Sequence, residues 1–536
     1  MTIRQQLVFG VLLVATTAWA VADEPGTADA NSSDPVRMTI RDEPRQETSY
    51  TTTEVTASLE AAADAPYGCG HPAGCSCAKM QALKKAVAAS HKGVFYDNKF
   101  DYLCDPCYDG WALGDQLKRL AVGDLITVDV GGQYRLREQS EREMRNMLYS
   151  PPGGTARPTG GLTGHSDDFL LQRTRLYVNT EIGERVRVYV ETLDAQSAHQ
   201  KFAPRANEVN RWELQNLFGD FVMLEDCGGK LTARLGRQEL LYGSQRIISP
   251  LDWANTRRTF DAGKLMWKGT DWDIDAFWAR PLRREFERLD PSNENRELYG
   301  IYSTYKGWGK DTLDLYWLLE DWHEYPATPP GFDYQTAGGR YNGSSGQWLY
   351  EAEGGYQFGK NSDRTDHTAG FFTLGLGRKL ECLTWKPTLW GYYDWASGAN
   401  QAGNGYSQYE PLGHKYLGYM DFFGRANIED ANVQLTMQPT ERLTLLAWFH
   451  YFWLQNGHDV PYNVDMVPYA NLGTNSAGSR DLGEELDLTA TVTLTQRMSA
   501  MFGYSHFFSG QFYKTTPSIP YRGDADFFYT QFTVDF

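Results

Sequence analysis

The stretch KLTARLGRQELLYGSQRIISPLDWANTRRTFDAGKLMWK, Lys230–Lys268, contains two alternating runs joined by a long arginine-rich loop. In the first run, apolar residues at positions 231, 233 and 235 alternate with a face that carries Arg234. In the second, Leu265 and Trp267 alternate with a face that carries Lys264. Because successive side chains of a strand point to opposite sides, each run has one apolar face and one cationic face. Such strands are typical of a wall between lipid and a water-filled pore.

The composition of the whole chain agrees with this interpretation. Its 536 residues can hold one barrel of roughly 400 residues, at roughly 20–25 residues per strand and turn, plus a small N-terminal segment. Aromatic residues make up 14%, a load typical of the aromatic girdles at two membrane interfaces. The net charge of −17 argues against a nucleic-acid-binding protein, which would carry a basic footprint.

The N-terminal fifth of the chain divides into three parts by composition. Residues 1–22 resemble a secretory signal peptide, with Arg4 in the charged region, an apolar run and an Ala18-Trp19-Ala20 cleavage pattern. The apolar run is shorter than the ~20 residues of a membrane helix. Residues 23–66 are acidic and poor in large apolar residues, which predicts a disordered spacer. Residues 67–120 form a cysteine-rich segment that we place in the periplasm, and residues 121–536 form the barrel.

The cysteine-rich segment has two chemical interpretations. It contains five of the seven cysteines of the chain, namely Cys69, Cys75, Cys77, Cys104 and Cys107. In an exported protein this set predicts two disulfides with one thiol left over. The Cys-x2-Cys pair and nearby sulfurs could alternatively form a tetrahedral metal site, such as one for zinc. Haem attachment is disfavoured because Tyr108, not histidine, follows Cys107. We therefore expect no cofactor, apart from this candidate metal.

From Leu125 onward the chain repeats alternating runs of about ten residues, separated by Gly, Pro, Asn and Asp. These runs predict an all-β transmembrane antiparallel barrel of roughly 16 to 18 strands. The pairs Gly338-Gly339 and Gly354-Gly355 are interpreted as turns or barrel kinks. The last run, Asp526–Phe536, places Phe528, Phe532 and the terminal Phe536 on one face. This resembles the terminal signal of bacterial outer-membrane barrels.

Two segments resemble a known family. RTRLYVNTEIGERVRVYVETLDAQS, Arg173–Ser197, and RLGRQELLYGSQRIISPLDWANTRRTFDAGKL, Arg234–Leu265, resemble the alginate export family of outer-membrane porins. The shared pattern is an R-x-R hairpin, a G-R-Q-E-L run and an R-x-F-D stretch before the next strand. The resemblance implies an 18-stranded barrel whose constricted lumen carries arginine and lysine and passes a polyuronate, a sugar chain with one carboxylate per residue.

The candidate pore residues follow from the alternation and from these motifs. Five arginines alternate with apolar residues and are expected to face the lumen: Arg173, Arg175, Arg185, Arg187 and Arg234. A second group lies at a strand end and in the arginine-rich loop: Arg237, Arg257 and Arg258. The supporting carboxylates are Glu191, Glu239 and Asp261. Guanidinium groups bind carboxylates in a bidentate way, so these arginines suit an anionic passenger. The alternative is structural, with the arginines paired to carboxylates of the wall and the loop anchored by ion pairs.

The leading hypothesis is an outer-membrane channel of a Gram-negative-type bacterium that passes an alginate-like polyuronate or its fragments. A general porin for small anions or nutrients is the first alternative. The second is an envelope-anchoring barrel whose cysteine-rich segment binds a periplasmic or cell-wall partner. The expected partners are outer-membrane lipid and an anionic polysaccharide. An enzyme is not expected, because neither G-x-S-x-G nor H-E-x-x-H occurs.

Overall fold

The computed structural model describes residues 75–108, 110–144, 148–149, 157–158, 164–323, 331–399, 404–466, 468–469, 479–516, 519 and 521–536. The predicted signal peptide, the predicted spacer and Cys69 lie outside the described residues, as does the side chain of Cys77. The described helices are α2 (Cys77–Ala88), α3 (Gln511–Thr515) and four 3-10 turns, η1 (Phe95–Asp97), η2 (Asp101–Cys104), η3 (Asp115–Leu117) and η4 (Gly413–Lys415). None of the described helices has the length and apolarity needed to cross a membrane.

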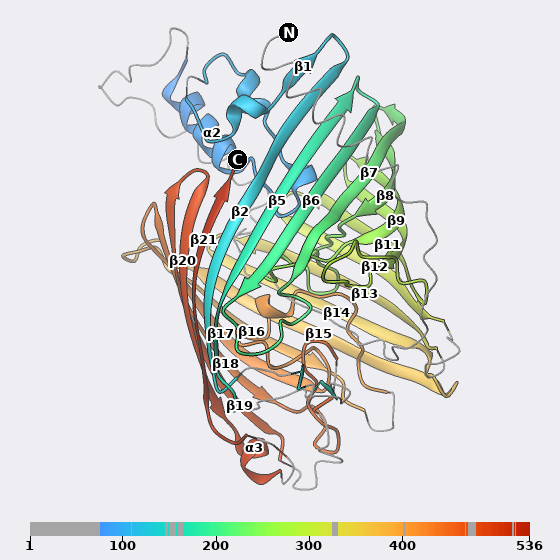
Figure 1. The fold of residues 1–536 in the computed structure, drawn as a ribbon, viewed down its shortest axis with the longest axis vertical. Coiled ribbons are helices and arrows are strands. Elements are labelled where there is room, and N and C mark those ends of the chain that lie inside the picture. Colours follow the sequence, from blue (N-terminus) through green and yellow to red (C-terminus); the bar gives the residue numbers. More distant parts are fainter. Residues whose placement is uncertain are drawn as a thin grey trace.

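The wall of the molecule is a closed antiparallel barrel of 18 strands (Figure 1). Its strands are β2 (Ile126–Arg142), β5 (Asp167–Ile182), β6 (Val186–Ala198), β7 (Asn210–Asp226), β8 (Gly229–Gln238), β9 (Phe260–Gly269), β10 (Trp272–Pro281), β11 (Arg296–Trp308), β12 (Asp311–Trp322), β13 (Asp333–Ser345), β14 (Trp348–Lys360), β15 (Asp366–Lys379), β16 (Thr388–Ala396), β17 (Ile428–Thr440), β18 (Leu443–Trp453), β19 (Asp481–Thr495), β20 (Met498–Ser509) and β21 (Ala525–Asp535). The short β1 (Leu120–Val122) pairs with β2, and β3 (Leu148–Tyr149) pairs with β4 (Arg157–Pro158).

The barrel closes between its first and last strands. β2 pairs with β5 on one side and with β21 on the other. The register continues into the terminal residue, because Gly132 N donates to Phe536 O at 2.9 Å and Phe536 N donates to Gly132 O at 3.0 Å. Closure leaves no unpaired sheet edge, which a membrane would not tolerate.

The two ends of the barrel differ. At one end, which we call the turn end, most connections are two or three residues long, for example 183–185, 227–228 and 270–271. At the other, which we call the loop end, the connections include the long segments 239–259, 397–427 and 454–480. The described N-terminal residues lie against the turn end (Figure 1).

The outer wall is apolar, as the alternation predicts. Exposed apolar side chains occur on strands around the barrel: Leu176, Leu235, Leu265, Ile301, Leu315, Val433, Phe502, Phe528 and Phe532. Side chains of the opposite parity are buried inside. On β5, Arg173, Arg175 and Tyr177 are each 2% exposed or less, whereas Leu176 is 44% exposed. The prediction that Phe528 and Phe532 share an outward face with apolar neighbours is confirmed.

The sequence did not predict the strand β13, and the interpretation of the two glycine pairs as turns is wrong. Gly338 pairs with Gly355 and Gly339 with Gly354 in the middle of β13 and β14. A Cβ at Gly338 would lie 2.6 Å from the ring of Tyr316, which is buried on the lumen side of β12. The glycine therefore makes room for a neighbouring aromatic ring and does not end the strand.

The cysteine-rich segment contains one described disulfide. It joins Cys75 to Cys107 across 32 residues. Cys104 is an exposed free thiol, as are Cys227 and Cys382 in the barrel. Within the described residues, no group of three or more His, Cys, Asp or Glu side chains could hold a metal ion. For Cys75 and Cys107 the disulfide interpretation is therefore confirmed, and the metal interpretation is wrong because their sulfurs are bonded to each other.

Candidate functional site

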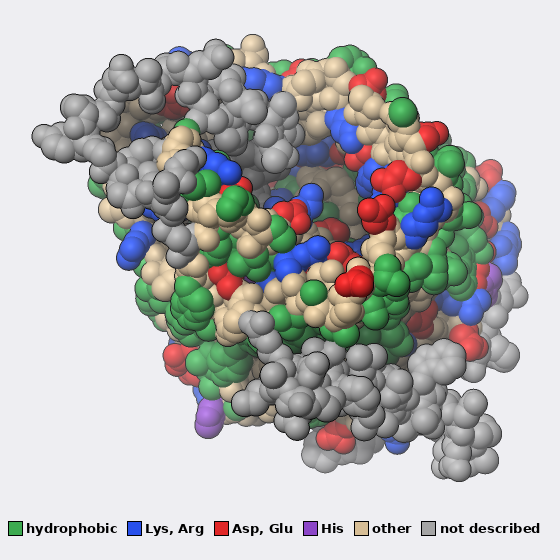
Figure 2. Space-filling model, turned by 90° about the horizontal axis from the view of Figure 1, so that it is seen from above, with side chains coloured by type: hydrophobic (Ala, Val, Ile, Leu, Met, Phe, Trp, Pro, Cys, Tyr) green, Lys and Arg blue, Asp and Glu red, His purple; other side chains and the backbone are tan. Residues whose placement is uncertain are grey.

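Charged side chains gather in the hollow centre of the barrel. Figure 2 looks onto the turn end and shows basic and acidic side chains around a central depression, with hydrophobic side chains on the outer wall. The lumen-facing positions of β5, β6 and β8 supply four of the eight predicted arginines, Arg173, Arg175, Arg187 and Arg234. Within this region the side chains form two groups, each built around one aspartate.

The first group, the Asp252 cluster, joins strand arginines to the long loop 239–259. Arg173 of β5 and Arg257 of the loop form ion pairs with the Asp252 carboxylate, and Arg175 Nη1 lies 3.8 Å from Asp252 Oδ1. Arg135 of β2 donates from Nη1 to Asp252 O at 2.5 Å. The four guanidiniums therefore bind one loop residue through its carboxylate or its backbone carbonyl.

The predicted carboxylates Glu191 and Glu239 complete this cluster. Arg175 Nε donates to Glu191 Oε1 at 2.6 Å, and both side chains are fully buried. Glu239 pairs with Arg257, and its Oε2 lies 3.8 Å from Arg175 Nη2. This is the bracing arrangement of the structural alternative, because buried charges need such partners.

The two loop carboxylates of the cluster differ in their acidity. Burial raises the pKa of Glu239, although Arg257 and Arg175 oppose this shift. Burial also acts to raise the pKa of Asp252, but Arg173 and Arg257 hold it well below its ordinary value. Asp252 is therefore ionised at neutral pH, and it keeps the loop attached to the wall as an anion.

The second group, the Asp220 pair, lies on β6, β7 and β8. Arg234 donates from Nε to Asp220 Oδ1 at 2.7 Å and from Nη2 to Oδ2 at 3.0 Å, a bidentate contact. Arg187 donates from Nε to Asp220 Oδ2 at 2.9 Å. The carbon of the Arg234 guanidinium lies 4.1 Å from the centre of the Phe218 ring. Two cations therefore share one carboxylate at this level of the wall.

Two predicted positions lie outside the lumen. Arg185 is exposed in the turn 183–185 and lies one residue before β6, so it does not face the lumen as predicted. Arg237 pairs across the sheet with Asp261, two residues from the outward-facing Leu235, so both charged side chains face outward. Arg237 Nε donates to Asp261 Oδ1 at 2.9 Å near the loop end. The outer face accommodates these two charged side chains because they lie at a strand end and form ion pairs.

The long loop 239–259 lies inside the barrel, as do parts of 397–427. Arg258 connects them by donating from Nη1 to Ser249 O at 3.0 Å and to Glu410 O at 2.6 Å. Trp253 lies between the Arg137 guanidinium, 3.3 Å from its ring centre, and the His414 ring, 4.2 Å away. The loop segment Ser249–Phe260 therefore narrows the lumen by packing against side chains that face it.

Arg135, Arg137 and Asp252 are lumen residues that were not among the predicted pore residues. The two arginines had a usable signal, because they alternate with Tyr134 and Leu136 as Arg173 and Arg175 alternate with their neighbours. Asp252 had none, because it lies in a loop whose path depends on distant strands. For a carboxylate in a loop, the sequence does not show which residue it pairs with or which way its side chain points.

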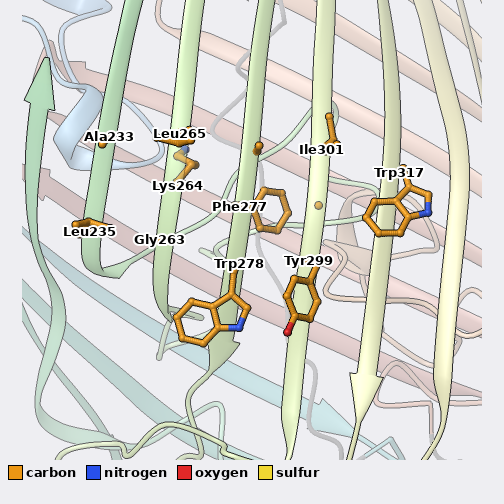
Figure 3. A pocket seen from close by; sticks show the side chains of 12 residues that line it. Ala233, Leu235, Gly263, Lys264, Leu265, Phe277, Trp278, Tyr299, Ile301 and Trp317 are labelled. Carbon is orange, nitrogen blue, oxygen red and sulfur yellow. The ribbon is translucent and has the colours of Figure 1, made fainter. Parts of the chain in front are cut away.

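One groove lies on the outside of the wall and is separate from the lumen. It has a volume of about 400 Å³ and lies across β8 to β12, where Figure 3 shows Trp278, Tyr299 and Trp317 on neighbouring strands. Small residues open it, including Gly263 and Gly300. Because Leu235, Leu265 and Ile301 line it and face outward, the groove is part of the lipid-facing surface and not of a solute path.

Comparisons with known proteins agree with this architecture. The Acinetobacter baumannii protein OccAB1 is similar in structure, with a TM-score of 0.50, 10% identity, and coverage of 76% of this chain and 96% of that chain. The Pseudomonas aeruginosa protein OccD3 (OpdP) has a TM-score of 0.49 and 11% identity, covering 78% of this chain and 94% of that chain. At such identities the likeness to OccAB1 concerns the fold alone. A search of curated protein sequences finds no significant match.

The family comparison is more specific. The model of the alginate export family matches residues 127–521, which includes β2 and nearly all of the barrel. Both motifs on which the resemblance was based lie within this range. The chain belongs to the alginate export family, and its barrel lies in the outer membrane.

Proposed function

We propose that this chain is an outer-membrane channel that passes an alginate-like polyuronate, or fragments of it, along the arginines of its lumen. The observation that carries the proposal is the Asp252 cluster, in which guanidinium groups inside the pore hold a carboxylate on a loop. A uronate carboxylate has the same charge and the same two acceptor oxygens. Weak and repeated contacts of this kind let a polyanion enter and leave, whereas one very strong site would trap it.

The direction of the barrel follows from its connections. Outer-membrane barrels have short turns on the periplasmic side and long loops outside. We therefore place the turn end, with the cysteine-rich segment, in the periplasm and the loop end at the cell surface. In this orientation the cysteine-rich segment faces the periplasm, where we propose that it could bind a periplasmic or cell-wall partner.

A general porin for small anions is the second candidate. It is favoured by the loops 239–259 and 397–427, which occupy part of the lumen and leave less room for a polymer. In this case the same arginines would select small organic acids.

Single-channel recording in planar bilayers tests the proposal. The full-length protein should prefer anions in a salt gradient, and polyuronate should block its current, whereas a neutral oligosaccharide of equal length should not. Cation preference would contradict the selectivity. Anion preference without polyuronate block would favour the small-anion porin.

A matched pair of variants tests the role of the lumen charges. Arg234→Gln removes a buried lumen cation, and Arg185→Gln removes an exposed cation in a turn. We expect Arg234→Gln to weaken polyuronate block by roughly tenfold or more, since a hydrogen bond to a charged group contributes about 1.5–3 kcal/mol. Arg185→Gln should leave the block unchanged. Equal effects of the two substitutions would mean that the lumen position of the charge is unimportant.

A further inference from the structure

A short piece of the cysteine-rich segment enters the lumen from the turn end. This piece is residues 93–97, and its rings pack against aromatic side chains of β5, β6 and β7. Tyr96 lies edge-on to Tyr189 and Phe218, with ring centres 5.8 and 5.2 Å apart. Tyr177, which packs against Phe95 at 5.7 Å, also faces the lumen. The segment therefore lies along the wall that carries the predicted arginines.

The same segment occupies guanidinium groups of both clusters through backbone oxygens. Arg257 of the Asp252 cluster donates from Nη2 to Gly93 O at 2.9 Å. Arg187 of the Asp220 pair donates from Nη1 to Tyr96 O at 2.7 Å. These carbonyls accept hydrogen bonds from the donors that a carboxylate of a passing chain would use.

Two rings of the segment cover further guanidiniums. The carbon of the Arg175 guanidinium lies 3.7 Å from the centre of the Phe95 ring, and that of Arg234 lies 4.4 Å from the centre of the Tyr96 ring. Cations are attracted to ring faces, so each ring stabilises a charge while shielding it from the lumen. The segment therefore contacts Arg175, Arg187, Arg234 and Arg257, four of the eight arginines selected from the sequence.

The segment also meets the loop that descends from the opposite end. Tyr96 Oη donates to Glu239 O at 2.7 Å, and Glu239 begins the loop 239–259. The contact of Arg257 with Gly93 lies in the same loop. Elements from the two ends of the barrel therefore touch within the lumen.

The base of the segment is anchored separately from its tip. Arg497, in the turn between β19 and β20, donates to Val87 O at 2.9 Å, to Ser90 Oγ at 2.8 Å and to Tyr102 Oη at 2.8 Å. The disulfide Cys75–Cys107 closes the chain on both sides of residues 93–97. The tip can therefore leave the arginines while the base stays attached to the turn end.

We propose that residues 93–97 are a plug that occupies the carboxylate-binding arginines of the lumen, and that a polyuronate displaces this plug to pass. A backbone carbonyl accepts a charge-assisted hydrogen bond from an arginine, but a carboxylate adds its own negative charge and can accept two parallel bonds from one guanidinium, so the polyanion competes favourably for the same donors. The inference rests on the proposed function for the identity of the competing ligand.

The plug is tested in the full-length chain by the double substitution Phe95→Ala and Tyr96→Ala. The control is Trp111→Ala, which removes a ring that is 70% exposed in the same segment. We expect the double variant to conduct at least about twice the wild-type current without polyuronate. The polyuronate concentration for half-block should fall roughly tenfold. Without the two rings, the arginines are open in most molecules, so the polyuronate no longer has to displace the plug before it binds. The control should match the wild type in both measurements.

The outcomes separate the plug from the proposed passenger. A folded double variant with wild-type current and wild-type half-block would overturn the plug, while block of both proteins would leave the proposed function standing. A raised current with no block of either protein would keep the plug as a closing element but reject the polyuronate.

A second measurement does not depend on the double variant. In a Tyr96→Cys variant, alkylation of position 96 by a small maleimide is followed by peptide mass spectrometry. The labelling rate should rise several-fold when polyuronate is added and should not respond to a neutral oligosaccharide. An unchanged rate in a channel that polyuronate blocks would show that the segment stays in place, which contradicts displacement.

Discussion

Asp252 is the residue on which the lumen arginines converge. It belongs to a loop, yet its carboxylate pairs with guanidiniums from β5 and from the loop itself. Removing one partner of a buried charge pair leaves the other charges uncompensated, which costs more than the pair contributes. Asp252 therefore holds the loop in the lumen and at the same time neutralises part of the positive charge of the pore.

We expect Asp252→Asn to loosen loop 239–259 and to increase anion preference. The substitution removes the anion that Arg173 and Arg257 bind. Because the Asp252 side chain is 33% exposed, the loss of stability should lie below the about 3–5 kcal/mol of a fully buried pair. The midpoint of urea unfolding reports the stability, and the reversal potential in a salt gradient reports the selectivity.

The control for this prediction is Glu225→Gln, which removes an exposed carboxylate near the turn end. This variant should keep the wild-type urea midpoint, since exposed pairs contribute about 0–1 kcal/mol. If Asp252→Asn were as stable as this control, the carboxylate would not hold the loop.

At the scale of one element, β9 shows how strictly the strand period assigns each side chain to lipid or lumen. Leu265 is 48% exposed on the outer wall. Lys264, one residue before it, pairs with Asp275 at 3.3 Å on the inside. A shift of one residue therefore moves a side chain from lipid to the pore.

This assignment predicts opposite outcomes for neighbouring substitutions. Leu265→Arg should destabilise the barrel by about 2–4 kcal/mol, the cost of an arginine facing lipid at mid-depth. Met266→Arg places the same charge on the lumen face, opposite Asp275 in the cross-strand register, and should be tolerated. Urea unfolding in lipid vesicles measures both. Equal destabilisation would mean that the faces are not separated as the register requires.

A neighbouring element also explains why the sequence did not predict the strand β13. Its sequence, DYQTAGGRYNGSS, has small residues where the other strands have apolar ones. Gly338 is needed because Tyr316 of the neighbouring strand fills the space inside. The reason for the composition therefore lies in a different strand, and the strand's own sequence does not contain it.

For the whole molecule, Lys118 is a buried charge where the cysteine-rich segment meets the barrel wall. This lysine is 5% exposed, donates from Nζ to Val130 O at 2.5 Å and lies 5.3 Å from the centre of the Tyr177 ring. Burial lowers its pKa to about 8, although Asp129 opposes the shift.

The lowered pKa predicts that attachment strengthens as the pH rises from 7.5 to 9.5. The free side chain titrates near ~10.4, so in this interval the detached form holds the proton more often. Stability rises with pH wherever the unfolded state binds more protons, and the gain is roughly 2 kcal/mol. A fluorophore on Cys104, with Cys227 and Cys382 replaced by Ser, would report the urea concentration at which the segment detaches.

The variant Lys118→Met is the reference for this measurement. It should detach at a urea concentration that changes much less between the two pH values, because the titrating group is gone. If wild type and Lys118→Met responded to pH alike, other groups would control the attachment.

The sequence by itself determined the barrel, its apolar outer face and the lumen position of Arg173, Arg175, Arg187 and Arg234. These conclusions depend on a period of two along each strand, which is a local property of the backbone. The sequence also showed the resemblance to the family, because the family motifs are continuous segments of the chain.

Only the tertiary structure decided what those arginines bind. Arg175 meets Glu191 sixteen residues away in the chain, but Arg187 meets the backbone of Tyr96 ninety-one residues away. The paths of residues 93–97 and of loop 239–259 depend on the surface that a closed barrel presents, and no local period describes that surface. Arg185 and Arg237 show the same limit, because one residue at a strand end decides between lumen, turn and outer wall.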